Sequence, residues 1–174
     1  MEGRQTLVDE DFEVPQGLLN EKFRLRMLTI HDLVKDYEAV MSSVEHLKET
    51  YSAIWDSDWP EGLTIEEDLI DLGWHHREFT LRYSFAYTVM SPDESLCLGC
   101  VYINPCRKIG YDAEVSMWVR SSELVNNLDS ELYSCIKKWI DEAWPFSTPA
   151  YPGRAIMIKD WRKIPDNLDK SGAS

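Results

Sequence analysis

The chain has 174 residues, 44% of them hydrophobic, which suits one domain with a buried core and leaves two domains crowded. Its net charge of −13 argues against nucleic acid as a partner, because phosphate contact needs clustered Lys and Arg. No apolar run of about 18 residues is present, so we expect no membrane contact through a spanning helix. Met1 to Asp11 lacks the apolar stretch of a secretory signal, so we expect a cytoplasmic protein with reduced cysteines.

Three segments divide the chain. Residues 1–16 are polar and acidic and contain Pro15, so we expect a flexible acidic arm. The globular domain is expected to span residues 17–158. Residues 159–174 form a polar tail in which Trp161 is the candidate aromatic anchor.

The first half of the domain predicts one strand followed by helices. Residues 23–28 alternate apolar and basic side chains, as in a strand with one buried face. Thr29 or Asp32 is suited to open the helix that follows. A second short helix is expected over residues 44–51, and residues 52–62 are expected to form a tryptophan-bearing loop.

The next long helix carries its own start signal. Thr64 and Glu67 have the spacing of a capping box, in which each side chain bonds the other residue's backbone amide. Three strands then follow, joined by short turns, which predicts an antiparallel meander over residues 85–90, 96–103 and 112–120.

The end of the domain predicts strand, helix and strand. In the strand at 112–120, residues Ala113, Val115, Met117 and Val119 point one way and the intervening side chains the other. A helix-period apolar stripe then predicts a helix over residues 129–144, which Pro145 ends. A last strand is expected over residues 148–157, interrupted at Pro152.

This order of elements resembles the GCN5-related N-acetyltransferase (GNAT) family over about residues 22–156. Residues 23–29 resemble the family's first strand, Leu98 to Ile103 with Gly99 the third, and Ala113 to Val119 the fourth. The resemblance implies an α+β fold with α/β/α layers, in which helices flank a mixed, mainly antiparallel twisted sheet. It also implies an acetyl-CoA-dependent N-acetyltransferase.

The resemblance also implies where acetyl-CoA would bind. In the family, the fourth and fifth strands splay apart, and the pantetheine arm lies in the gap against the fourth strand's backbone, here Met117, Trp118 and Val119. A glycine-rich loop then holds the pyrophosphate at a helix N-terminus, where free amides favour anions. In this chain, the residues placed to hold the pyrophosphate are Arg120, Ser121, Ser122 and Asn126.

The pyrophosphate loop departs from the family pattern. Its two glycine positions hold Asn127 and Asp129, and its Arg/Gln position holds Leu124. Asp129 and Glu131 also place two carboxylates at the helix start, where they would repel a diphosphate. The chain is thus a divergent sequence without the glycine-rich loop.

Two residues are candidates for acid–base catalysis. Glu114 matches the position at which some family members carry the base that deprotonates the amine. The alternative is a carboxylate on the solvent side of the strand, or one paired with Arg120. Tyr133 is the candidate general acid, with Tyr151 as a substitute; for both, ring packing is the alternative role.

An acidic aromatic loop is the candidate acceptor site. Trp55 and Trp59, with Asp56 and Asp58, suit a small-molecule amine, because rings bind the body of a cation and carboxylates its charge. Trp74 on the next helix is a further candidate wall. The alternative is a packing cluster between helix and loop.

No metal site is expected. His75 and His76 are adjacent on a helix and point about 100° apart, so they cannot chelate together. Cys97 and Cys100 lack a second Cys or His pair at zinc spacing.

Two functional hypotheses follow. The first is acetyl-CoA-dependent N-acetylation of a small amine. The second is a non-catalytic GNAT-like binding or regulatory module that has lost acetyl-CoA binding; the loop favours it, whereas Glu114 favours the enzyme. A homodimer is left open, with no specific support in the sequence.

Overall fold

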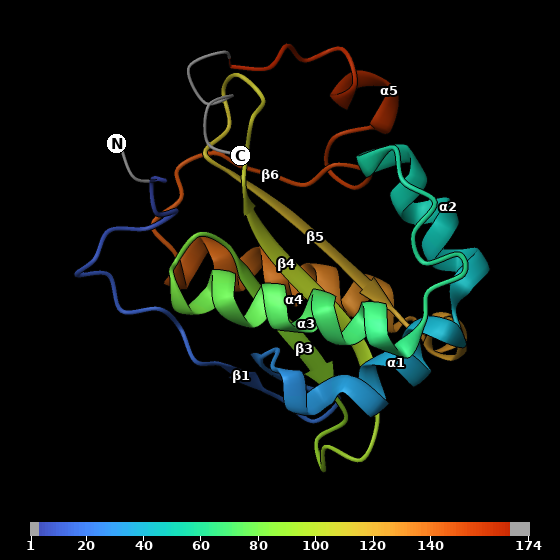
Figure 1. Cartoon of the computed structure of the whole chain (residues 1–174). Helices are drawn as coiled ribbons and strands as arrows, with labels where there is room; N and C mark the ends of the chain where they lie inside the picture. The colour runs from blue at the N-terminus through green and yellow to red at the C-terminus, as the bar shows by residue number, and fades with distance from the viewer. Residues whose placement is uncertain (1–3, 168–174) are drawn as a thin grey trace.

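A computed structural model describes residues 4–167 and shows one curled sheet between two layers of helices (Figure 1). The six strands lie in chain order: β1 (Gly17–Leu19), β2 (Arg24–Met27), β3 (Phe85–Met90), β4 (Cys97–Pro105), β5 (Ala113–Val119) and β6 (Pro149–Ala150). Neighbouring strands are antiparallel except for β5 and β6, which are parallel. The expected mixed, mainly antiparallel α+β architecture is therefore confirmed.

Helices cover both faces of the sheet. The α-helices are α1 (Leu33–Met41), α2 (Val44–Trp55), α3 (Ile65–Thr80), α4 (Leu128–Ala143) and α5 (Ile158–Trp161), and two 3₁₀ helices are η1 (Ile30–Asp32) and η2 (Ser121–Asn126). Val40 of α1, Leu47 of α2 and Leu72 of α3 share one core with Trp118 of β5. The α4 residues Leu132, Ile136 and Ile140 pack in a second core on the opposite face.

The alternation in β5 decides which residues face which layer. Val115 and Met117 belong to the core beneath α4, as predicted. Trp118 belongs to the other core, with α1, α2 and α3. Because both faces of the sheet are covered, Ser116 and Arg120 are also buried, at 3% and 8% exposure.

Two capping boxes set where the helical segments begin. Thr64 Oγ1 accepts the Glu67 amide at 3.2 Å, and Glu67 Oε2 accepts the Thr64 amide at 2.9 Å. Thr29 and Asp32 make the same reciprocal arrangement at the start of η1. Both starts agree with the sequence-based expectation, because capping is set by residues only three positions apart.

Helix α2 is longer than expected. We expected a loop from residue 52, whereas the helix continues to Trp55. The ring of Trp55 stacks on Tyr51, one helical turn earlier, with centroids 4.0 Å apart. Such an i,i+4 ring contact stabilises the added turn and places Trp55 on a rigid element.

The first and last strands also differ from expectation. β6 contains only two residues, where a strand over 148–157 was expected, because Pro152 and Gly153, with φ +78°, turn the chain away from the sheet. β1 was not expected. It begins at Gly17, with φ +136°, where a Cβ atom would lie 1.9 Å from the Leu25 carbonyl oxygen.

The described part of the N-terminal arm packs on the domain, although we expected a flexible segment. Val8 is 4% exposed, and the Leu7 amide donates to the Arg82 carbonyl at 2.8 Å. The Tyr87 hydroxyl donates to the Pro15 carbonyl at 2.7 Å. In the tail, Trp161 is buried beside Cys106, as an aromatic anchor would be. The ends of the arm and the tail, residues 1–3 and 168–174, lie outside the described residues.

Candidate functional site

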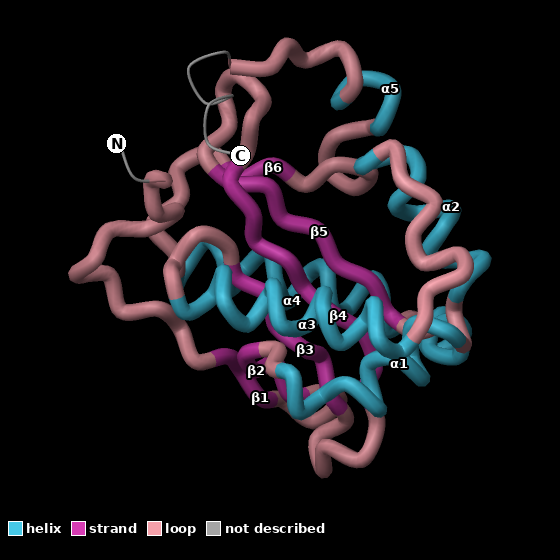
Figure 2. The backbone as a smooth tube through the Cα atoms, in the orientation of Figure 1, coloured by secondary structure: helices cyan, strands magenta, loops and turns pink. Residues whose placement is uncertain are grey.

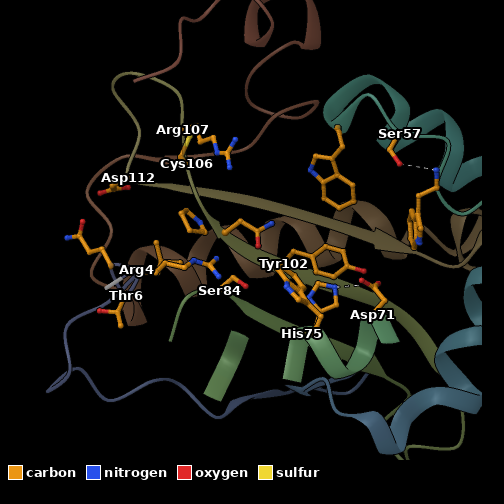
Figure 3. A pocket seen from close by; sticks show the side chains of 17 residues that line it. Arg4, Thr6, Ser57, Asp71, His75, Ser84, Tyr102, Cys106, Arg107 and Asp112 are labelled. Carbon is orange, nitrogen blue, oxygen red and sulfur yellow. Dashed lines mark hydrogen bonds and ion pairs between the residues drawn. The ribbon is translucent and has the colours of Figure 1, made fainter. Parts of the chain in front are cut away.

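A cavity of about 710 Å³ lies on the α2–α3 side of the sheet, and aromatic rings form much of its wall. We call it the aromatic pocket; its ring-bearing members are Trp55, Trp59, Trp74, His75 and Tyr102. Figure 3 shows it from close by, with Tyr102, His75 and Asp71 along one side and Ser57 at the far end from Arg4. Arg4 and Thr6 of the N-terminal arm close the opposite end.

The rings hold one another in place. The Trp55 ring lies 5.9 Å from Tyr102 in an edge-on arrangement, and His75 stacks on Tyr102 at 5.2 Å. Trp59 approaches Trp55 at 6.5 Å. Three of these rings come from different elements, α2, α3 and β4, so the fold itself assembles the pocket. Trp55, Trp59 and Trp74, the candidate acceptor-site rings, all line this cavity.

Carboxylates flank the aromatic end of the pocket. Asp71 Oδ2 lies 3.6 Å from His75 Nε2, one turn along α3 (Figure 3). Beneath it, burial raises the pKa of Asp68 to about 6, and the charge of Asp71 adds to the shift. Burial also raises the pKa of Asp36 on α1 well above its usual value. Of these three acids only Asp71 lines the pocket, because burial keeps Asp68 and Asp36 away from it and favours their uncharged forms.

Glu114 lies beside this pocket. Its carboxylate accepts a hydrogen bond from Trp55 Nε1 at 3.4 Å, and burial raises its pKa. It does not pair with Arg120, the structural alternative considered from the sequence. Arg120 instead binds the Glu38 carboxylate through two nitrogens, at 2.7 and 2.8 Å. A half-buried carboxylate with a raised pKa accepts a proton more readily than an exposed one, as a general base must.

The other acceptor and acid candidates lie outside the pocket wall. Asp56 and Asp58 are exposed, and Asp56 ends α2 with φ +52°, while Ser57 between them lines the pocket. Tyr133 lies on α4, against the opposite face of the sheet from Glu114. Its ring lies 5.7 Å from Tyr151. The structure therefore does not bring Tyr133 and Glu114 together.

A second, smaller cavity marks the place where β5 and β6 part. The two strands pair only at Ala113–Pro149 and Glu114–Ala150 and then separate (Figure 2). Beyond the last pair, a cavity of about 310 Å³ is lined by α2, residues 116–118, Asp129 and residues 152–154. We call this gap the wedge. Met117 and Trp118, two of the residues expected at the pantetheine arm, line it.

The polar groups expected to hold acetyl-CoA are engaged within the chain. Arg120 is bound to Glu38 and also donates to Ser122 Oγ at 3.1 Å. The Ser121 amide donates to Ser43 Oγ at 2.9 Å. Asn126 donates to the Glu123 carboxylate at 3.0 Å.

The backbone groups expected to bind the pantetheine arm also have partners within the chain. The carbonyl of Met117 accepts a hydrogen bond from Arg154 at 3.2 Å. Val119, the third residue expected at the arm, pairs with Gly99 of β4 and packs in the core beneath α4. The residues, as they are arranged, do not fit the diphosphate and pantetheine arm of acetyl-CoA.

Trp118 separates the two cavities. Its indole lines the wedge and donates to the Tyr102 hydroxyl at 3.1 Å. It also meets Trp59 edge-on, with centroids 6.5 Å apart. Since Tyr102 and Trp59 line the aromatic pocket, the buried Trp118 ring lies between the pocket and the wedge.

Sequence reasoning missed Asp71, His75 and Tyr102. The first two lie four residues apart on α3, and that i,i+4 spacing of an acid and a histidine was the available signal. Tyr102 stood within an apolar run and shows no feature that separates a pocket wall from a core residue.

No protein-family model matches the sequence, and no curated protein matches it. Solved structures do match. One is a ribosomal-protein-S5-alanine acetyltransferase from Vibrio fischeri, with 15% identity and a TM-score of 0.55 over 73% of this chain and 68% of that one. Another, from Bordetella pertussis, is described as a GnaT-family acetyltransferase, with 14% identity and a TM-score of 0.56 over 75% of this chain and 74% of that one. This chain has the GNAT fold.

A further match is the microcin C7 self-immunity acetyltransferase MccE in complex with acetyl-CoA and AMP, with 13% identity and a TM-score of 0.52. It covers 74% of this chain and 68% of its own. At such identities the likeness concerns the GNAT fold, and activity has to be argued from the residues. Within residues 4–167 no helix has the length and apolarity needed to cross a membrane.

Proposed function

We propose that this protein binds a small organic cation, such as a primary amine, in the aromatic pocket, as a GNAT-fold binding module that does not use acetyl-CoA. The observation that carries the proposal is that rings from α2, α3 and β4 line one cavity together with Asp71, while Glu114 lies behind the pocket residue Trp55 and accepts its hydrogen bond. Ring faces attract cations by about 0.5–2 kcal/mol each, more where water is excluded.

The shape and charge of the site support this ligand class. The cavity of about 710 Å³ is large enough for a small metabolite. The chain's charge of −13 attracts cations from a distance and raises their encounter rate. The pocket wall also carries two arginines, Arg4 and Arg107, and Arg4 is paired with Glu78 at 2.6 Å.

Calorimetric titration with benzylamine, against benzyl alcohol as a neutral ligand of similar shape, tests the proposal. Benzylamine is expected to bind about tenfold more tightly, because only the ammonium gains from the rings and carboxylates. Equal affinity for the two ligands would remove the case for a cation site. A peptide with a free amino terminus belongs in the same series, since one structural neighbour is named for acetylating a ribosomal protein.

N-acetyltransfer to an amine is the second candidate, and the place of Glu114 favours it. A carboxylate with a raised pKa beside the pocket could accept the proton that a bound ammonium must lose before it attacks. Titration with acetyl-CoA and release of the CoA thiol in the presence of benzylamine distinguish the two candidates. Turnover that Glu114→Gln abolishes would establish the enzyme, and absence of both binding and turnover would leave the binding module.

A further inference from the structure

Arg154 occupies the part of the wedge where the GNAT resemblance places the pantetheine arm. β5 and β6 stop pairing after Glu114 and Ala150, which would free the β5 backbone beyond that point for a ligand. At Met117 that backbone already has a partner. The Arg154 guanidinium donates to the Met117 carbonyl at 3.2 Å.

Arg154 is fixed in this position from two further sides. Its two terminal nitrogens donate to the two oxygens of Asp129, at 2.8 and 2.9 Å. Its guanidinium also lies over the Tyr133 ring, 5.1 Å from the centroid. A two-pronged arginine–carboxylate pair is both strong and geometrically restrictive, and here the arginine side chain is only 18% exposed. The guanidinium is therefore held in the wedge by Asp129 and Tyr133, both from α4.

Asp129 places a negative charge at the start of α4, where the family would hold the negatively charged pyrophosphate of the cofactor. It lies in the first turn of α4, where the positive end of the helix dipole stabilises an anion. A phosphate approaching this helix start meets the carboxylates of Asp129 and Glu131. Each of these carboxylates already has a cation of its own, Arg154 for Asp129 and Lys22 for Glu131, and nearby Arg120 is bound to Glu38, so no cation at this helix start is left for a phosphate. One acidic side chain thus serves the helix end and holds Arg154.

We propose that the Arg154–Asp129 pair is a built-in occupant of the cofactor wedge, which closes it to acetyl-CoA in the native chain. The GNAT-type splay of the strands is kept, but an internal guanidinium satisfies the exposed strand carbonyl in place of a pantetheine amide. The remaining cavity of about 310 Å³ is correspondingly small. This inference concerns the wedge alone and does not rest on the cation site in the aromatic pocket, which Arg154 does not line.

Calorimetric titration of the wild type and of Arg154→Ala with pantetheine and with acetyl-CoA tests the proposal. Pantetheine lacks the diphosphate, so it reports on the wedge without repulsion from Asp129 and Glu131. Arg154→Ala is expected to bind pantetheine at least about tenfold more tightly than the wild type, which should show no binding at about 1 mM. Asp129→Asn, which weakens the hold on Arg154, is expected to give a smaller gain of the same sign.

Controls keep the result decisive. Arg24→Ala removes an arginine paired with Glu94 at 3.2 Å on β2, away from the wedge, and should leave pantetheine affinity unchanged. Should Arg154→Ala fail to fold by circular dichroism, Arg154→Met keeps the aliphatic stem while removing both sets of hydrogen bonds. No gain in pantetheine affinity for the folded variant, or acetyl-CoA binding by the wild type as tight as by the variant, overturns the proposal. Equal benzylamine affinity in the wild type and the variant would show that the cation site in the aromatic pocket is independent of Arg154.

Discussion

The aromatic pocket and the wedge lie on either side of Trp118, but they differ in how completely their charged side chains are paired. In the wedge, Arg154 and Asp129 satisfy each other at 2.8 Å, and nearby Arg120 is satisfied by Glu38. Beside the pocket, the acids have weaker partners: Asp71 has a histidine 3.6 Å away, and Glu114 has one hydrogen bond of 3.4 Å. A satisfied ion pair needs no ligand, whereas underpaired charge in a cavity gains from one.

The difference also separates backbone shape from side-chain chemistry. The splay of β5 and β6 is a feature of backbone shape, and it persists here with an internal side chain in it. The pocket, in contrast, keeps features that cost stability: exposed rings, and carboxyl groups whose burial raises their pKa values. Natural proteins retain such costs mainly where a function needs them. This contrast is the reason for assigning ligand binding to the pocket.

The largest effect is expected where the N-terminal arm completes the pocket. Arg4 lies 2.6 Å from Glu78, whose side chain is fully buried, and over the Tyr83 ring at 4.4 Å. Arg4→Ala leaves Glu78 with only the mostly exposed Arg77, so we expect a loss of about 2 kcal/mol in the free energy of unfolding. Urea unfolding measures it. Arg77→Ala is the matched control and should cost less; an equal or larger loss there would mean that Arg4 is not the principal partner.

The next effect concerns the ring that links the pocket to Glu114. Trp55 faces Tyr102 across the pocket, stacks on Tyr51 and donates to Glu114. Trp55→Ala is expected to weaken benzylamine binding about tenfold, or about 1.4 kcal/mol, through loss of one ring face. Trp55→Phe keeps a ring and should recover most of the affinity. Unchanged affinity in Trp55→Ala, measured by calorimetry, would place the cation elsewhere.

The sequence predicts the pocket less well than the fold, and α3 shows why. The capping box at Thr64 and Glu67 is local, so the start of α3 could be predicted. Its buried face could not, because the buried positions include Asp68 and Glu78, which an apolar stripe does not reveal. Leu69, which an apolar stripe would bury, is instead 43% exposed. On α3, the acids Asp68 and Glu78 occupy buried positions where the helix period predicts apolar residues.

Contacts between distant segments were the other obstacle. The bond from Arg154 to Asp129 joins residues 25 positions apart, and no pattern in the sequence connects them. The departure from the glycine-rich loop was visible in the sequence, but what fills the resulting space was not. The contact between Arg4 and Glu78 could not be predicted either, because Arg4 lies in an acidic segment and no pattern connects it to Glu78.

A smaller effect is expected from the buried acid below the pocket. Burial holds the pKa of Asp68 near 6, above its usual 3.8, Asp71 adds to the shift and His75 opposes it. The folded state therefore favours the protonated form, so this contribution to stability is present below about pH 4 and is lost as pH rises through 6. Asp68→Asn mimics the protonated acid. It should stabilise the protein by about 1 kcal/mol at pH 7, after allowing for the lost helix-start charge.

Thermal unfolding across pH 4–7 measures this effect. The gain from Asp68→Asn should shrink toward pH 4, where the folded wild type is protonated at Asp68 and the unfolded state is approaching its own pKa of 3.8. Asp93→Asn provides a control of the opposite sign, because hydrogen bonds from Ser91 and Ser95 lower the pKa of Asp93 to about 2. A gain for Asp68→Asn that does not vary with pH would show that ionisation of Asp68 is not the cause.

The smallest effect concerns Glu114 and sharpens the contrast between pocket and wedge most directly. Burial raises the pKa of Glu114, so its negative charge, and with it the attraction for a cation, should weaken at a higher pH than for an exposed glutamate as pH falls. We expect benzylamine affinity to fall a few-fold, by about 0.5–1 kcal/mol, between pH 7 and pH 5 in the wild type. Glu114→Gln keeps the hydrogen bond to Trp55 but removes the charge, and it should bind with the lower affinity at both pH values.

Pantetheine binding by Arg154→Ala should not respond to the same change in pH, because Glu114 does not line the wedge. A shared response would mean that the two cavities act as one site, with Trp118 as a movable partition between them.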